Sequence, residues 1–89
     1  MIVYNWSLEK NDWLKRNRGV CFEQVVLRVE QGEVLDAFPH PNQRQYPGQS
    51  ILIIEIDHYA YAVPFVENDG EVFFKTMIPS RKETAKYLR

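Results

Sequence analysis

The second half of the chain changes to a period of two in its apolar residues, and this feature constrains the fold most. Three consecutive segments have the composition and length of strands: "SILIIEID", "YAYAVPFVE" and "EVFFKTMI". Asp57-His58 separates the first two segments, and "NDG" (Asn68 to Gly70) separates the second from the third. Short polar connections of this kind join antiparallel neighbours, so the sequence predicts a β-meander. Pro64 lies inside the middle segment and predicts a bulge or an end of pairing there.

The first half of the chain has helical patterns instead. The opening "MIVYNW" is rich in β-branched and aromatic residues and predicts a short first strand. Ser7 is a good N-cap for a helix that runs to Gly19. A second helix ends at Gly32, and its apolar stripe consists of Phe22, Val25, Val26 and Val29.

A third helix is predicted at the end of the chain, where Ser80 and Glu83 have the spacing of a capping box. Residues 1–89 are therefore predicted to form a single α+β domain, a small antiparallel β-meander packed with two N-terminal helices and a C-terminal helix. "EVLDAF", before the meander, is compatible with either a strand or an extended lead-in. The next segment, "PHPNQRQYPGQ", has three prolines and predicts a long loop.

Several classes of protein are disfavoured by what the sequence lacks. It has no apolar stretch of membrane-spanning length and no signal peptide, and Cys21 is the single cysteine. We therefore expect a cytoplasmic protein without disulfides or a membrane association. A domain of 89 residues buries a modest share of its surface, so a homo- or hetero-oligomeric partner would add stability.

The charges are distributed unevenly, although the formal net charge is only −1. The basic residues gather toward the two ends of the chain, and the middle is acidic. Residues 74–89 alone contain five cations and one acid, Glu83. If the first helix meets the last strand and helix in space, the two ends would form one cationic surface.

Metal or cofactor chemistry is not indicated, because the residues that would support it are scattered. The two histidines, His40 and His58, are isolated, and no glycine-rich phosphate loop is present. Cys21 has no visible basic partner that would activate its thiol. We therefore predict no metal site and no cofactor.

The cations near the C-terminus are open to two interpretations. In the first interpretation, all five are solvated charges on a surface strand and a short helix: Lys75, Arg81, Lys82, Lys86 and Arg89. Arg81 and Lys82, however, fall in the first turn of the last helix, where the helix dipole disfavours positive charge. Cations at a helix start suit the binding of an anion such as a phosphodiester. Charge alone leaves the choice between binding and solvation open.

The proline-rich loop offers a second polar cluster, formed by His40, Asn42, Arg44 and Tyr46. His40 lies between two prolines, where a turn residue is the default interpretation. The alternative is a group that transfers a proton near neutral pH or contacts a phosphate.

The order of these motifs resembles the BrnT family of toxins from bacterial type II toxin–antitoxin modules. The resemblance covers most of the chain and is weakest in the central loop. It rests on Trp6, Glu9, Lys10, Asn11, Gly19, Val20, Phe22 and Glu23 at the front, and on Met77, Ile78, Arg81, Lys82 and Tyr87 at the back. Two places depart from the family pattern. Asn17-Arg18 stands where Lys-His is common, so any role of that histidine is either lost or taken over by Arg18. Lys75 is offset by one residue from the usual basic position in the last strand.

The resemblance implies a RelE-like fold and a small metal-independent ribonuclease that inhibits translation. It also implies a co-encoded, DNA-binding antitoxin that neutralises the toxin and represses the shared operon with it. An antitoxin segment that covers the cationic surface would be expected to be acidic.

Metal-free RNA cleavage needs a base, an acid and cations around the phosphate. The charge pattern and the resemblance together suggest which residues supply these groups. We expect Arg81 and Lys82 to stabilise the developing charge, helped by the helix N-terminus, and Lys75 to contact a phosphate. His40 is the expected proton carrier, with Tyr46 or Tyr87 as substitutes. The expected contacts with the RNA strand come from Lys10, Arg44, Tyr46 and Lys86.

Two further functions remain open at this stage. The same basic surface could belong to a non-catalytic module that binds RNA or a protein, such as a toxin homologue without activity. A structural homo-oligomer would instead show no salt-dependent affinity for RNA.

Overall fold

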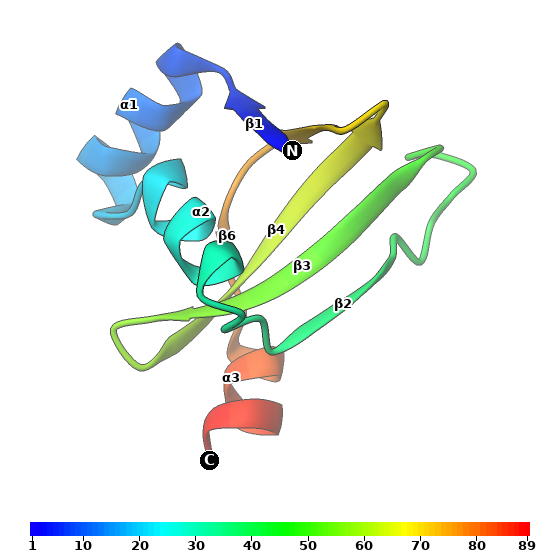
Figure 1. Cartoon of the computed structure of the whole chain (residues 1–89). Coiled ribbons are helices and arrows are strands. Elements are labelled where there is room, and N and C mark those ends of the chain that lie inside the picture. Colours follow the sequence, from blue (N-terminus) through cyan, green and yellow to red (C-terminus); the bar gives the residue numbers. More distant parts are fainter.

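The period-two segments form the centre of a six-stranded sheet in the computed structural model, which describes residues 1–89 (Figure 1). Three helices pack on this sheet, and the predicted α+β class is confirmed. The elements in chain order are β1 (Val3–Trp6), α1 (Leu8–Arg18), α2 (Phe22–Glu30), β2 (Asp36–Pro39), β3 (Gln49–Ile56), β4 (Tyr59–Asn68), β5 (Glu71–Phe74), β6 (Ile78–Pro79) and α3 (Arg81–Leu88).

The predicted meander is present as β3, β4 and β5, which pair antiparallel in sequence order. The β3–β4 turn consists of Asp57 and His58, whose φ angles of 52° and 66° are left-handed. The β4–β5 turn places Asp69 and Gly70 in the same region, at 51° and 81°. Two consecutive residues with positive φ give the turn whose twist matches that of a two-residue hairpin.

Pro64 interrupts pairing on one side of β4 only. On the β3 side, Pro64 remains in register opposite Ile51. On its other side, β4 pairs first with β6 at Tyr61 and Ala62, and then with β5 from Phe65 onward. The third predicted segment is therefore divided into β5 and β6, and residues 75–77 between them lie outside any strand.

The two remaining strands form the edges of the sheet, whose order is β1-β5-β4-β3-β2. "EVLDAF" supplies β2, which is antiparallel to β3. β1 pairs with β5 in parallel, with Val3 opposite Glu71 and Trp6 opposite Phe74. The sheet is therefore mixed, and the expectation of a purely antiparallel sheet is corrected at β1.

Helices α1 and α2 cover one face of the sheet, and a buried amide joins them. The N-terminus of α1 is capped by the Ser7 hydroxyl, which accepts a hydrogen bond from the backbone N–H of Lys10 at 3.1 Å. Asn11 is 3% exposed. Its Oδ1 accepts from the backbone N–H of Phe22 at 2.8 Å, and its Nδ2 donates to Glu23 Oε1 at 2.8 Å. One side chain thus satisfies a free donor at the start of α2 and fixes the two helices together.

An aromatic cluster forms one side of the core beneath these helices. The Phe74 ring stacks on the rings of three other residues, with centroid distances of 5.7 to 6.3 Å: Tyr4, Trp6 and Phe22. Phe22 and Phe74 are 0% and 1% exposed. Because Tyr4 and Trp6 come from β1 and Phe74 comes from β5, this cluster holds the parallel pair together.

Helix α3 covers part of the opposite face. Ile53 and Ala60 alternate along their strands with core residues, so they point to this second face, and both are buried. The α3 side chain of Thr84 accepts a hydrogen bond from the backbone N–H of Ala60 at 2.8 Å. In Figure 1, α3 lies at the opposite end of the view from the N-terminus.

Half of the predicted capping box is present at the start of α3. The Ser80 hydroxyl accepts from the backbone N–H of Glu83 at 3.1 Å. The reciprocal bond is absent, because the backbone N–H of Ser80 donates to the carbonyl of Ala60 at 2.9 Å.

None of the three helices has the length and apolar composition needed to cross a membrane.

Candidate nucleic-acid interface

Helix α1 presents a row of cations with an exposed indole among them. The Lys10 ammonium lies 4.3 Å from the centre of the Trp13 ring, and the Arg18 guanidinium lies 4.9 Å from it. Trp13 is 37% exposed, so this arrangement is at the surface. The ion pairs of the chain join other residues, Arg28 with Glu33 and His58 with Glu55. The positive charge of α1 is therefore not neutralised by direct pairs; it comes from Lys10, Lys15, Arg16 and Arg18.

Arg18 connects α1 to the segment that leads into α3. Its Nη1 donates to the backbone carbonyl of Met77, a residue that is 0% exposed. Met77 is followed by the two residues of β6 and then by Ser80. The end of α1 is thus bonded to the segment that precedes β6 and α3, although α1 and α3 themselves lie on opposite faces of the sheet.

Arg81 and Lys82 are exposed in the first turn of α3, and neither forms an ion pair. They are therefore free to contact an anion. The helix N-terminus itself contributes less than expected. The Glu83 side chain is buried in the same turn, and its Oε2 has no hydrogen-bond partner. A carboxyl group at that place opposes a second anion, so attraction must come from the side chains of Arg81 and Lys82.

Lys75 is exposed in the connection between β5 and β6, outside the strands. Its backbone N–H donates to the Pro64 carbonyl at 2.8 Å, and its ammonium lies 5.3 Å from the centre of the Phe73 ring. Because Lys75 lies outside the strands, its offset of one residue from the usual basic position does not place its side chain on the opposite face of the sheet. Lys75 lies two residues before Met77, whose carbonyl Arg18 binds, and at the level of Pro64 on β4.

His40 is not brought together with Arg81 and Lys82. Its backbone N–H bonds to Gln49, which pairs with Val66 of β4, whereas Ser80 bonds to Ala60 of the same strand. Six residues of β4 separate these two levels, which corresponds to about 20 Å along the sheet. This corrects the expected constellation, in which His40 transfers protons beside Arg81. The position of a long loop follows from the strand end that it leaves, and the sequence did not reveal that end.

The β2–β3 loop has an ordered structure of its own. The His40 Nδ1 accepts from the backbone N–H of Asn42 at 3.0 Å, and its ring lies 4.5 Å from that of Tyr46. The Gln43 side chain donates to the carbonyls of His40 and Gln49. Arg44 and Tyr46 are exposed in the same loop as His40. The loop lies at the end of the sheet away from α3 (Figure 1).

Tyr87 lies in the last turn of α3, six residues after Arg81, or about 9 Å along the helix axis. Its hydroxyl donates a hydrogen bond to Asp36 Oδ2 of β2. This bond lowers the pKa of Asp36, and the backbone N–H of Ala37 lowers it further. The same bond raises the pKa of Tyr87, and the hydrogen bond between Tyr87 and Lys86 raises the pKa of Lys86. Tyr87 therefore stays protonated near neutral pH and holds α3 to β2.

Replacing Tyr87 by phenylalanine is expected to move the pKa of Asp36 back up toward its ordinary value of 3.8. In the native protein, the bond stabilises the fold above that pH and is lost as the pH falls through the lowered pKa of Asp36. On the alkaline side, the stabilisation is present below pH 10.0 and is lost as the pH rises through the raised pKa of Tyr87. Carboxyl carbon shifts followed by NMR between pH 2 and 6 measure the change (about the range in which carboxyls titrate).

The matched control for this prediction is Tyr46→Phe, because Tyr46 is exposed in the β2–β3 loop. It should leave the titration of Asp36 unchanged. An Asp36 curve that is identical in the native protein and in Tyr87→Phe would contradict the assignment of the hydrogen bond.

The sequence missed part of this interface. Trp13 and Arg16 were not singled out, although they lie in the first basic segment and line a shallow surface hollow with Lys10. The net charge of that segment was the available signal. No group of three or more His, Cys, Asp or Glu side chains is positioned to hold a metal ion. Comparison with protein-family models, with curated proteins and with solved structures found no match to this chain.

Proposed function

We propose that this protein is the toxin of a bacterial type II toxin–antitoxin module, with a RelE-like fold, and that it cleaves RNA without a metal ion. The observation that supports this most directly is the bond from Arg18 to the Met77 carbonyl, which ties the basic helix α1 to the segment that leads into α3. The resemblance to BrnT toxins, carried by Arg81, Lys82 and the front motifs, names the activity. The proposed place of action is the cytoplasm.

The proposed reaction begins with attack of the RNA 2′-oxygen on the adjacent phosphorus, which forms a P–O bond and breaks the bond to the 5′-oxygen. Negative charge accumulates on the phosphorus oxygens as this proceeds. Arg81, Lys82, Lys75 and Arg18 are the groups available to stabilise that charge. Because His40 lies about 20 Å along the sheet from the start of α3, it does not reach the reacting phosphate. Water therefore takes the proton of the 2′-hydroxyl and returns one to the leaving 5′-oxygen. The protein contributes charge stabilisation and positioning.

RNA outside the reacting phosphate would be held along α1 and α3. Lys10 and Arg16 flank the exposed Trp13, and phosphate contacts there would set the position of the strand. Lys86 lies in the last turn of α3 and extends the same set of contacts. Arg44 and Tyr46 could be reached only by an RNA that also extends to the other end of the sheet.

The test is induction of the protein in a bacterial host, combined with cleavage of an RNA oligonucleotide in EDTA. We expect growth arrest that a neighbouring, co-expressed antitoxin gene relieves, and RNA products that persist when EDTA is present. Cleavage that EDTA abolishes would contradict the metal-free reaction, and growth without arrest would contradict the toxin.

A second function is supported by the separation of His40 from the cations of α3. A module that binds RNA or a protein without turnover needs the charges but no proton carrier. It would bind the same oligonucleotide with an affinity that falls as salt rises, and it would release the RNA intact.

A further inference from the structure

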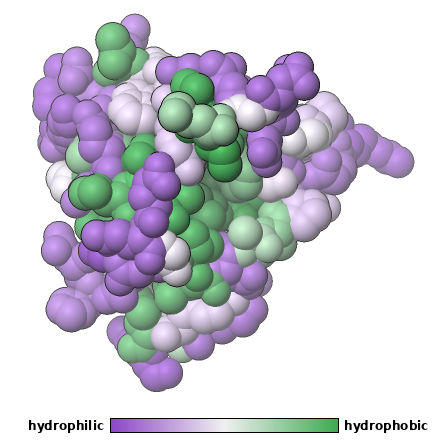
Figure 2. Space-filling model, in the orientation of Figure 1, coloured by the Kyte–Doolittle hydropathy of each residue, from purple (hydrophilic) through white to green (hydrophobic).

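A small apolar pocket opens on the face of the sheet that α1 and α2 cover, the face opposite to α3 (Figure 2). Figure 2 shows apolar surface in the middle of this face, which is otherwise bordered by hydrophilic residues. The pocket has a volume of about 120 Å³, and seven of its eight lining residues are hydrophobic. Its walls come from β1, α2, β3, β4 and β5, and include Ile2, Tyr4, Leu52, Phe65 and Phe74.

The volume of this pocket identifies the size of its occupant. Pockets for metabolites and drug-sized ligands usually enclose about 300–1,000 Å³. A cavity of about 150 Å³ accommodates one benzene molecule. At about 120 Å³, this pocket has room for one bulky apolar side chain.

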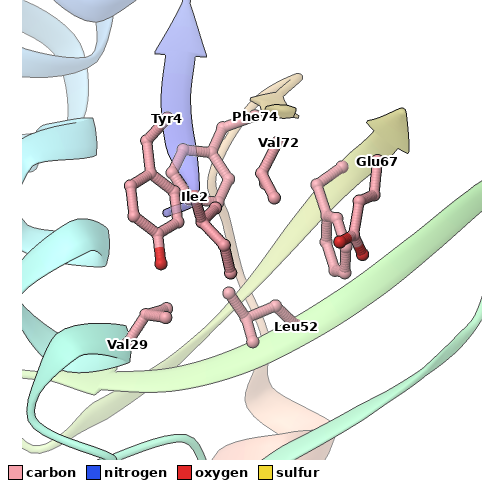
Figure 3. A pocket seen from close by; sticks show the side chains of 8 residues that line it. Ile2, Tyr4, Val29, Leu52, Glu67, Val72 and Phe74 are labelled. Carbon is pink, nitrogen blue, oxygen red and sulfur yellow. The ribbon is translucent and has the colours of Figure 1, made fainter. Parts of the chain in front are cut away.

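The rim of the pocket is acidic. Figure 3 shows the Glu67 carboxylate and the Tyr4 hydroxyl on opposite sides of the apolar walls. Burial raises the pKa of Tyr4, and the nearby charges of Glu30 and Glu67 raise it further. Glu30 and Glu67 are both exposed, and neither forms an ion pair. A positive charge carried next to the apolar group would therefore be attracted here.

Strand β1 supplies a backbone edge beside the same pocket. It is the outermost strand, paired only with β5, so its other edge has unpaired N–H and C=O groups. Ile2 and Val3 are 49% and 52% exposed at this edge, and Ile2 also lines the pocket. An extended segment can add to such an edge while one of its side chains enters the pocket.

We propose that this pocket and the β1 edge bind an extended segment of a partner protein that carries one bulky apolar side chain next to a lysine or arginine. A second copy of this chain is a poorer occupant, because its own edge segment, residues 1–6, contains no lysine or arginine to meet the acidic rim. The surface is separate from the cations of α1 and α3, so the partner segment and RNA can be bound at the same time.

The experiment is selection of a random twelve-residue peptide library on the full chain. We expect the enriched peptides to share one Leu, Ile, Met or Phe within two residues of a Lys or Arg. Fluorescence anisotropy then gives the affinity of the best peptide for each variant. Glu67→Lys and Ile2→Glu should each weaken binding roughly tenfold, about 1.4 kcal/mol, and both residues are exposed enough for the fold to tolerate the change.

The matched control is Glu55→Lys, because Glu55 lies on the opposite face of β3 and pairs with His58. It should change the affinity by less than about twofold. Saturating peptide should also leave the affinity for an RNA oligonucleotide unchanged. Enrichment of acidic peptides, no enrichment, an equal loss in Glu55→Lys, or a dimer that Ile2→Glu dissociates would each overturn the proposal.

Discussion

The double substitution Arg81→Ala, Lys82→Ala is expected to lower the rate of RNA cleavage by at least about 10³-fold. Removing one preorganised group that stabilises developing negative charge costs about 10²–10³ in rate, and here two are removed together. Both side chains are exposed and form no ion pair, so the fold should be retained. Single-turnover cleavage of an RNA oligonucleotide measures the effect, and circular dichroism checks the fold.

Arg44→Ala is the control for this prediction, because Arg44 lies in the β2–β3 loop, away from α3. It should leave the cleavage rate nearly unchanged. If the protein binds RNA without cutting it, the same pair of variants still gives an answer. Losing two phosphate contacts to single-stranded RNA should reduce the slope of log K against log salt by about 1.4. An Arg81→Ala, Lys82→Ala protein with native cleavage and a native salt slope would remove both residues from the interface.

Phe74→Ala is expected to lower the free energy of unfolding by about 3–5 kcal/mol. The Phe74 side chain is 1% exposed and stacks on Tyr4, Trp6 and Phe22, so its removal leaves a cavity lined by rings. Domains typically have about 5–15 kcal/mol of stability in total, and a chain of 89 residues lies toward the small end. Urea unfolding followed by fluorescence measures the loss of stability. We expect the variant to be partly unfolded at physiological temperature.

Phe73→Ala provides the control, since it removes the same ring from the neighbouring position. Phe73 points to the opposite face of β5 and is only partly buried. Its loss should cost less than about 2 kcal/mol, as the exposed part of the ring contributes little. Equal losses in the two variants would contradict the placement of Phe74 on the core face of β5 and of Phe73 on the opposite face.

The sequence predicted the elements whose signals are local. Two polar connections, Asp57-His58 and Asn68 to Gly70, predicted the turns, and the structure confirms both, with the second turn limited to Asp69 and Gly70. Ser7 and Ser80 both cap helices as predicted, because an N-cap depends on residues within the same turn.

The pairing between distant segments could not be predicted. Val3 pairs with Glu71, and a parallel pair leaves no turn signal between its strands. The division of "EVFFKTMI" into β5 and β6 also depends on β4, where Pro64 marks the change of partner. The sequence placed the irregularity at the proline but gave no way to assign it to one side of the strand.

The candidate interface was predictable in part for the same reason. The positions of Arg81 and Lys82 follow from the N-cap at Ser80, which is a local signal. The distance from His40 to α3 depends on the registers of β2, β3 and β4 together, so a cluster seen in sequence gave no information about it. The contact of Arg18 with Met77 spans 59 residues and likewise required the folded chain.

Helix α3 packs on β4 alone among the central strands. Its attachment consists of this packing, the two paired residues of β6, the bonds of Ser80 and Thr84 with Ala60, and the bond between Tyr87 and Asp36. We expect this helix to detach at a lower free energy than the central strands, because local opening follows the number of contacts that must break. Detachment would carry Arg81 and Lys82 away while α1 stays in place. A regulator that captured the detached helix would therefore stop the proposed RNA cleavage without competing for the charged side chains.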